Sequence, residues 1–353
     1  MSLRRALILM ILFLGTCLQQ ANAQKFLWEV DFTGFFDNRE FKPPYQIPQT
    51  FFGTRLSPTI GIAIKEEHEL MGGLSWLQEF GSHKDRKIDW TIFYRFNSPK
   101  LKASFGAFPR RLLVEEYPSA LMYDSILYFN PNINGALIQY FCDAGYAEAY
   151  VDWRSQQTKT DREIFTMASS GRFNLKWAFA GWFLTVTHFA KPKNPEEEMH
   201  VIDNIMANPY VGGDFSRMTV FDSLQLKTGL LMSLDRNRGN GAWYRPIGFL
   251  GELTLQWRFL GLHDVFYVGE NQLPFYNDFG PALHLADPFY RAKVYNRTDL
   301  YIYLLRNKYV ECKASCNLHT ARKHLQFQQQ LLLRFNINQQ AVKKQNPHNW
   351  FRF

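Results

Sequence analysis

The feature that most constrains this chain is a period-two pattern of apolar and polar residues between Ser223 and Phe259. In both halves of the stretch, apolar side chains recur at every second position, with mostly polar side chains between them. The break between the halves, residues 236–241, is rich in Gly and Arg and is typical of a turn. Successive side chains of a strand point to opposite faces, so the stretch predicts a β-hairpin with one apolar and one polar face.

The same alternation recurs along the chain, for example at residues 56–64, 88–96, 147–153 and 325–335. Each half of the hairpin has about 10 residues or more, enough for a tilted strand to cross a bilayer. The whole chain gives about 16 strands, with 14 or 18 still open, and an even number suits a closed bacterial barrel. The connections alternate between short and generally longer, as periplasmic turns and external loops do. Residues 37–50, with three prolines, are expected to form the first of these loops.

Composition favours the same fold class. Aromatic residues make up 16% of the chain, mean hydropathy is −0.29, and no run of about 18 apolar residues follows the first 23 residues. Alternating strands cancel in hydropathy averages, so this combination predicts an all-β protein, a closed antiparallel transmembrane β-barrel. A secreted β-sandwich would explain the alternation, but not so many long strands with aromatic-rich apolar faces.

The first residues predict a secretory signal peptide. Arg4 and Arg5 precede an apolar run at residues 6–14, and Ala21-Asn22-Ala23 forms a small-x-small cleavage site before Gln24. Lipidation at Cys17 is the alternative, but the Thr before it suits that cleavage poorly. The expected division is a leader at 1–23, a barrel at 24–337 and a polar tail at 338–353, with the barrel located in the outer membrane.

The net charge and the cysteine count limit the partners and the cross-links that the chain can have. The leader holds two arginines and no acid, so the formal net charge falls from +8 to +6 on cleavage. On an exported chain, a basic balance suits lipopolysaccharide phosphates or anionic solutes better than nucleic acid, although the charges are dispersed and ordinary solubility also explains them. Three cysteines remain, an odd number that forms no disulfide framework: Cys142, Cys312 and Cys316.

The run from Phe105 to Arg110 (Phe-Gly-Ala-Phe-Pro-Arg) looks like the Gly-x-Phe-x-Arg strand end that leads into the constriction loop of porins. With the leader, the strand count and the loop alternation, the chain resembles the outer-membrane porin-type β-barrels of Gram-negative bacteria over nearly all of its mature length. The resemblance makes residues 109–133 a constriction loop. It also implies contact with outer-membrane lipid and lipopolysaccharide, recognition by the barrel-assembly machinery, and a possible homotrimer. Either Phe335 or Phe353 serves as the assembly signal.

Charged residues on the inward face are the candidate pore-lining groups. A lumen lined by both signs orients dipolar solutes and sets a weak ion preference, although each single charge is better explained by solvating the lumen or pairing with a neighbour. The candidates are Arg95, Glu148, Asp152, Arg154, Glu252, Arg258 and Arg334 on strands, with Arg110, Arg111, Glu115 and Glu116 near the constriction.

Other chemistry has weaker support. Glu196, Glu197 and Glu198 with His200 suit a solvated acidic loop better than a metal site, and no metal or cofactor is expected. The chain has no Gly-x-Ser-x-Gly, no His-Glu-x-x-His and no phosphate loop, and sequence cannot bring scattered Ser, His and Asp together. We therefore expect a passive channel for small hydrophilic solutes or ions, and not an enzyme. The alternative is a non-conducting barrel, serving a secretion or uptake assembly or acting as an outer-membrane enzyme.

Overall fold

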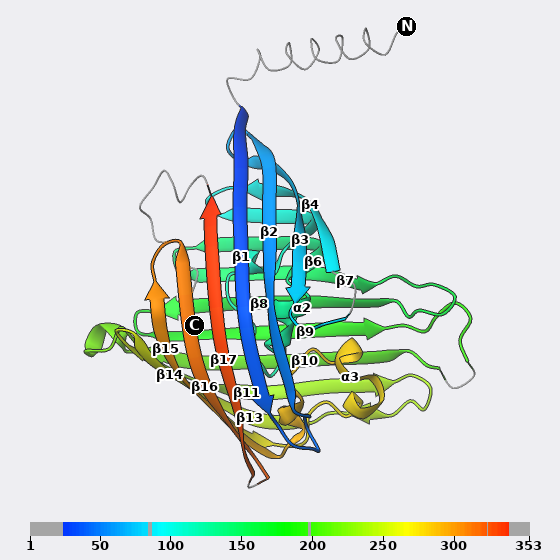
Figure 1. Cartoon of the computed structure of the whole chain (residues 1–353). Helices are drawn as coiled ribbons and strands as arrows, with labels where there is room; N and C mark the ends of the chain where they lie inside the picture. The colour runs from blue at the N-terminus through cyan, green and yellow to red at the C-terminus, as the bar shows by residue number, and fades with distance from the viewer. Residues whose placement is uncertain (1–23, 84–86, 197–198, 323, 339–353) are drawn as a thin grey trace, which may run out of the picture.

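The computed structural model describes residues 24–83, 87–196, 199–322 and 324–338. Its strands form one antiparallel sheet that closes through hydrogen bonds between β1 (Gln24–Glu40) and β17 (His324–Asn338). Figure 1 shows these two strands side by side, in blue and red. Closure pairs both edges of the sheet, which is what a strand structure needs inside a bilayer.

Sixteen strands of nine residues or more make the wall, and β12 adds a two-residue ladder at Trp243–Tyr244. The closed 16-strand antiparallel barrel expected from the sequence is confirmed. The other long strands are β2 (Gln49–Ile64), β3 (His68–Glu79), β4 (Lys87–Asn97), β5 (Leu101–Pro109), β6 (Asn132–Cys142), β7 (Gly145–Ser155), β8 (Ile164–Leu175), β9 (Ala178–Phe189), β10 (Ile202–Asp214), β11 (Ser223–Asn237), β13 (Ile247–Trp257), β14 (Leu260–Gly269), β15 (Val294–Arg306) and β16 (Val310–Ala321).

The period-two pattern places large apolar side chains on the outer face. Trp90 and Ile92 of β4 and Phe105 of β5 are 74%, 66% and 69% exposed, although all three are large apolar or aromatic residues within strands. Such exposure would be unfavourable in water and is what a lipid-facing band requires. The inner face carries the polar and aromatic residues that are buried.

The long connections gather at one end of the barrel, which by the usual rule is the external end. They include L1 (residues 41–48), L3 (110–131) and L7 (270–293). The alternation has exceptions. Only two positions separate β16 from β17 at the external end, whereas residues 215–222, with η2 (Ser216–Met218), make a longer connection at the opposite end.

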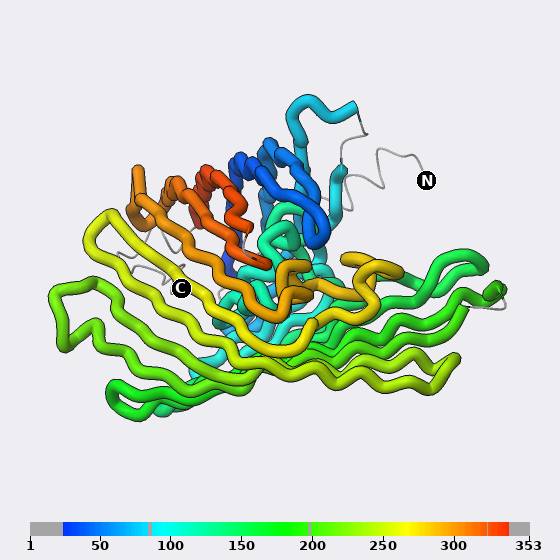
Figure 2. The backbone as a smooth tube through the Cα atoms, turned by 90° about the horizontal axis from the view of Figure 1, so that it is seen from below, coloured from blue at the N-terminus to red at the C-terminus, as the bar shows by residue number. Residues whose placement is uncertain are grey.

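L3 and L7 fold into the lumen. L3 carries η1 (Arg110–Leu112) and α2 (Ser125–Phe129), and L7 carries α3 (Tyr276–Leu283) and η3 (Pro288–Arg291). Figure 2 shows both segments inside the ring of strands. The loops are joined by backbone hydrogen bonds of 2.7 Å from Tyr123 N to Leu285 O and 2.9 Å from Asp287 N to Ser119 O.

Side chains of the two loops form one apolar cluster with the inner wall. Leu121 of L3 and Phe289 and Tyr290 of L7 are buried against inward-facing rings such as Tyr267 and Tyr295. L3 therefore enters the lumen as the resemblance implied, but together with L7 it packs as a plug. Among the described residues, none of the helices is long and apolar enough to cross a membrane. The expected leader, most of the expected tail and Phe353 lie outside the described residues.

Candidate functional site

Strand alternation divides the end of β1 between the two sides of the wall. Asp37 and Arg39 point into the lumen and are 0% and 3% exposed, whereas Asn38 is half-buried on the outer face and Glu40 is exposed there. The wall therefore has an inner polar network and an outer polar cluster that share the same backbone.

The inner network begins with an ion pair between neighbours on one face of β1. The Arg39 guanidinium donates to Asp37 Oδ2 over 2.7 Å and 3.1 Å, and Gln328 Nε2 donates to Asp37 Oδ1 over 2.7 Å. The same guanidinium lies 4.7 Å from the ring of Phe51 and 4.6 Å from that of Tyr123. Burial of both charges is tolerated because each has charge-assisted partners.

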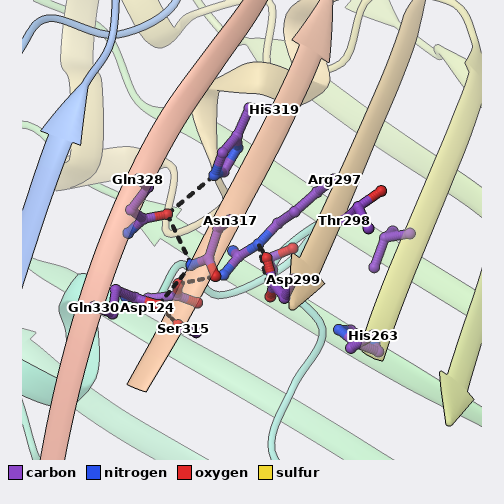
Figure 3. Close-up of polar contacts among 12 residues, drawn as sticks. Asp124, His263, Arg297, Thr298, Asp299, Ser315, Asn317, His319, Gln328 and Gln330 are labelled. Carbon is purple, nitrogen blue, oxygen red and sulfur yellow. Dashed lines mark hydrogen bonds and ion pairs between the residues drawn. The ribbon is translucent and has the colours of Figure 1, made fainter. Parts of the chain in front are cut away.

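The network continues across β17, β16 and β15. Gln328 Oε1 is 3.0 Å from His319 Nε2, and His319 Nδ1 is 2.8 Å from the Tyr295 hydroxyl. Figure 3 shows His319, Gln328 and Asn317 converging from adjacent strands. Both nitrogens of this imidazole are used, and the side chain is fully buried, so His319 is placed to support the wall rather than to meet a lipid.

A second inner contact fixes L3 to the wall. Asp124 accepts from Arg297 over 2.9 Å, and Arg297 also contacts Asp299 at 2.8 Å. Burial acts to raise the pKa of Asp124, but the Arg297 guanidinium outweighs burial and holds that pKa below its ordinary value. Figure 3 shows these three residues beside the Gln328 network.

L7 holds two buried groups with opposite shifts. Burial raises the pKa of Asp287 to about 6, although its carboxylate accepts from Phe289 N over 3.0 Å at the start of η3. Burial lowers the pKa of His284 to about 3, and neither ring nitrogen has a hydrogen-bond partner among the described residues. Both shifts favour the neutral form of the side chain, which is the direction that burial imposes.

The outer cluster, which we call the β1 cluster, consists of Asn38, Glu40, Thr50 and Gln329. Asn38 lies opposite Thr50 of β2 and Gln329 of β17. Thr50 Oγ1 donates to Asn38 Oδ1 over 2.8 Å, and Asn38 Nδ2 donates to Gln329 Oε1 over 2.7 Å and to Glu40 Oε1 over 3.2 Å. One amide thus orients a hydroxyl, a carboxylate and a second amide.

Aromatic rings mark the depth of the β1 cluster. Phe36 lies opposite Phe52, with ring centroids 5.6 Å apart, and Phe52 contacts Phe80 at 4.7 Å. The Phe36 and Phe52 rings face outward, each two residues from a member of the cluster on the same strand (Asn38 and Thr50). Two residues span about 7 Å along a strand. Aromatic girdles lie where acyl chains meet headgroups, so the cluster occupies the level at which lipid ester groups lie.

A second outward polar group lies on β14 and β15. Asp264 accepts from both Thr298 Oγ1, at 2.5 Å, and Asn296 Nδ2, at 3.1 Å to each carboxylate oxygen. These three bonds use most of the acceptor capacity of this carboxylate. Glu40 instead accepts a single 3.2 Å bond and is exposed, so its carboxylate remains available to a water molecule.

The structure places most of the predicted pore-lining residues in pairs on the inner face. Glu148 accepts from Gln139 and Ser170, each at 2.8 Å, and Arg154 donates to Pro281 O at 2.9 Å. The ion pairs are Arg95 with Glu69, Arg110 with Asp152, Arg111 with Glu29 and Asp31, Glu115 with Arg172, Glu116 with Arg334, and Glu252 with Lys227.

Arg258 is a correction to the expected inward placement. β13 ends at Trp257, and Arg258 occupies the short turn to β14 with φ of 54°. Its guanidinium lies 5.0 Å from the Trp257 ring, outside the lumen. The polar–apolar alternation continued one residue past the strand, which is why the sequence pattern misplaced it.

The predicted metal alternative falls partly outside the structure. Glu197 and Glu198 are not among the described residues. Within the described ranges, no three His, Cys, Asp or Glu side chains are grouped so that they could hold a metal ion. The cysteines of the described ranges, Cys142, Cys312 and Cys316, are free thiols.

Sequence reasoning missed the whole β1 cluster. Residues 37–50 were expected to be a loop, but β1 extends to Glu40 and β2 begins at Gln49. Polar side chains on the lipid side interrupt the pattern that marks a strand, so both strands seemed to stop early. Gln329 left a signal, because it breaks the apolar run of outward residues between Phe327 and Leu331.

The closed wall, lipid-facing band and filled external lumen define an outer-membrane β-barrel with polar groups on its lipid side. The profile of the family described as lipid A 3′-O-deacylase-type matches residues 18–344. The chain belongs to this family. A comparison with curated proteins finds no match.

Solved structures support the fold alone. The loop L8 deletion mutant of OmpT, an outer-membrane protein of Vibrio cholerae, is 9% identical with a TM-score of 0.56, covering 90% of this chain and 100% of that one. OpdK from Pseudomonas aeruginosa is 9% identical with a TM-score of 0.53, covering 89% and 99%. OprB from Pseudomonas putida is 8% identical with a TM-score of 0.51, covering 92% and 97%.

The family corrects two expectations from the sequence. The expectation of a passive porin-like channel for solutes is wrong, because the family is one of outer-membrane deacylases. The expectation that the protein is not an enzyme is wrong for the same reason, since a deacylase is a hydrolase. Porin resemblance identified the barrel and its membrane, but two barrels can share a wall and differ in chemistry.

Proposed function

We propose that this protein is an outer-membrane esterase that removes an ester-linked acyl chain from lipid A. The family match over residues 18–344 is the observation that carries the proposal. The β1 cluster supports it, because it offers a carboxylate, a hydroxyl and two amides on the lipid side of the wall. A substrate held in the outer leaflet can reach that face without entering the lumen.

In the proposed reaction, water attacks the ester carbonyl, the acyl–oxygen bond breaks, and a fatty acid and a sugar hydroxyl leave. Glu40 is exposed and has free acceptor capacity, so it serves as the general base that takes a proton from the water. Gln329 accepts from Asn38 through Oε1, which leaves its Nε2 as a donor for the developing oxyanion.

Asn38 serves as a positioning residue. Its amide group holds Glu40, Thr50 and Gln329 through hydrogen bonds of 3.2, 2.8 and 2.7 Å. The buried pair behind it, Asp37 and Arg39, fixes the backbone on the opposite face. Such support from a packed wall is what keeps reacting groups within a few tenths of an ångström of their working geometry.

The test is release of free fatty acid from lipid A by the purified barrel in mixed micelles, followed by mass spectrometry. Glu40→Gln should lower the rate about 100-fold or more, the typical contribution of a general base. Glu67→Gln is the matched control, because Glu67 is exposed in the turn between β2 and β3 at the other end of the barrel. Intact lipid A after prolonged incubation with folded wild-type protein would refute the activity. Equal rates for wild type and Glu40→Gln would remove the β1 cluster from it.

A further inference from the structure

A cavity of about 250 Å³ opens at the external rim, apart from the β1 cluster. It is lined by Tyr45 of L1, Asn271 of L7, Lys293 and Val294 at the start of β15, and Arg322 in the turn after β16. Drug-sized pockets occupy roughly 300–1,000 Å³, so this cavity suits a headgroup fragment rather than a whole lipid.

Two of its lining residues are cations that are not neutralised. Lys293 and Arg322 are exposed, and within the described residues neither forms an ion pair with a carboxylate. Glu270, which adjoins the lining residue Asn271, is already used, because its carboxylate accepts from Ile247 N over 2.9 Å. The cavity thus presents positive charge at the membrane surface.

Arg291 holds the aromatic floor of the cavity in place. It donates to Pro44 O over 2.8 Å, Tyr45 O over 3.0 Å and Asn277 Oδ1 over 2.5 Å, which ties L1 to L7. The Tyr45 ring lies 5.6 Å from the Arg291 guanidinium and 5.5 Å from that of Arg322. Cation–π contact with both groups orients the ring and keeps Arg322 beside the cavity.

The Tyr45 ring, and not its hydroxyl, borders the cavity. The side chain is 8% exposed, and the hydroxyl is buried without a hydrogen-bond partner among the described residues. The charged donors that the cavity offers to a ligand are its two cations, Lys293 and Arg322.

We propose that this rim cavity binds a phosphate group of an outer-leaflet lipid, with Lys293 and Arg322 as its donors. Phosphate oxygens match this set, because charge-assisted hydrogen bonds to an anion are the strongest that Lys and Arg make. Val294 is 50% exposed on the lipid side, so the cavity borders the membrane and a tethered headgroup can reach it. The assignment rests on the proposed lipid A substrate and adds a headgroup subsite to it.

The experiment measures binding separately from hydrolysis. In the Glu40→Gln background, affinity is compared for lipid A with both phosphates, for the enzymatically dephosphorylated lipid and for inorganic phosphate, by titration of the barrel in nanodiscs. The intact lipid should bind at least about 10-fold more tightly than the dephosphorylated one, and Lys293→Ala with Arg322→Ala should remove that preference. Tyr45→Leu removes the ring that keeps Arg322 beside the cavity and should reduce the preference severalfold.

A matched control removes the same number of positive charges at a site away from the cavity. Lys100→Ala with Arg217→Ala removes two exposed cations at the opposite end of the barrel, and should leave the preference intact. Equal binding of intact lipid to the rim variant and the control would overturn the subsite. Saturation by inorganic phosphate at the same concentrations as by lipid would assign the cavity to free phosphate and overturn the lipid assignment. Phosphate-dependent binding without fatty-acid release by wild type would sustain the subsite and reject the esterase.

Discussion

Asn38 lies directly opposite Thr50 on the lipid side of the wall, and Thr50 Oγ1 donates a 2.8 Å hydrogen bond to Asn38 Oδ1. The same amide donates to Gln329 on the last strand. One side chain therefore ties β2, β1 and β17 together just beyond the aromatic rings of Phe36 and Phe52. The penalty for outward polar side chains is small near the membrane interface, so the wall tolerates the cluster at the level where lipid ester groups lie.

Asn38→Ala should lower kcat about 10- to 100-fold with little change in KM. Removing the amide leaves Glu40 and Gln329 in place but takes away the group that orients them, and loss of orientation slows the chemical step. Steady-state kinetics on lipid A in micelles give both constants. A rise in KM with unchanged kcat would show that Asn38 binds substrate instead.

Thr50→Ala should reduce the rate more than Thr54→Ala. Both residues lie on the outer face of β2, but Thr50 bonds to Asn38 whereas Thr54 lies opposite Gly34. We expect a loss of roughly 10-fold for Thr50→Ala, the scale of one hydrogen bond, and less than twofold for Thr54→Ala. Fatty-acid release at equal amounts of folded protein provides the comparison, and equal losses would exclude Thr50 from the site.

Asp37→Ala should destabilise the barrel by about 3–5 kcal/mol, because it leaves the Arg39 guanidinium buried without its carboxylate. Replacing both residues, by Asp37→Leu with Arg39→Met, should recover most of the loss, since no buried charge then remains. Urea unfolding in lipid vesicles measures both variants. A double variant no more stable than Asp37→Ala would show that packing around Arg39, not charge, sets the effect.

Asp287 should make the L7 plug less stable as pH rises. Burial raises its pKa to about 6 from an unfolded value near 3.8, so the folded state holds a proton that the unfolded loop releases. The contribution is complete below pH 3.8 and is lost as pH rises to about 6. Hydrogen exchange of L7 amides should therefore quicken over that window, and Asp287→Asn should remove this part of the pH dependence.

His284 should act in the opposite direction. Burial lowers its pKa to about 3 from an ordinary value of 6.5, so the unfolded loop takes up a proton before the folded one does. Stability from this residue is complete above pH 6.5 and declines as pH falls toward 3. His284→Phe should make L7 exchange less sensitive to acid, whereas an unchanged profile would show that the imidazole is not buried in solution.

The wall could be predicted from the sequence because lipid imposes one rule on every strand. Trp90 and Ile92 both face outward because lipid contacts every second side chain of a strand. The repetition of this alternation gave the correct strand number and fold class. The ends of strands were predicted less well. Arg258 was placed one residue too far along β13, since a polar residue in a turn continues the alternation by chance.

The candidate site was not predictable by the same rule, because its residues violate it. Asn38, Glu40 and Thr50 face lipid while being polar, so a search for apolar outward residues ends both strands before reaching them. L7 also escaped attention. Its contacts with L3, such as Asp287 N to Ser119 O, join segments far apart in sequence, and no local pattern reports such a contact.

The closure of β1 on β17 has a consequence for when the proposed chemistry can begin. Asn38 and Gln329 are 291 positions apart in the sequence. The four side chains of the β1 cluster therefore come together only when β1 pairs with β17, the last strand. An exported but unassembled chain holds the two parts of the site on separate ends of an open polymer. Activity is therefore expected only in barrels whose first and last strands have paired. Intermediates that stall during insertion cannot hydrolyse the lipids around them.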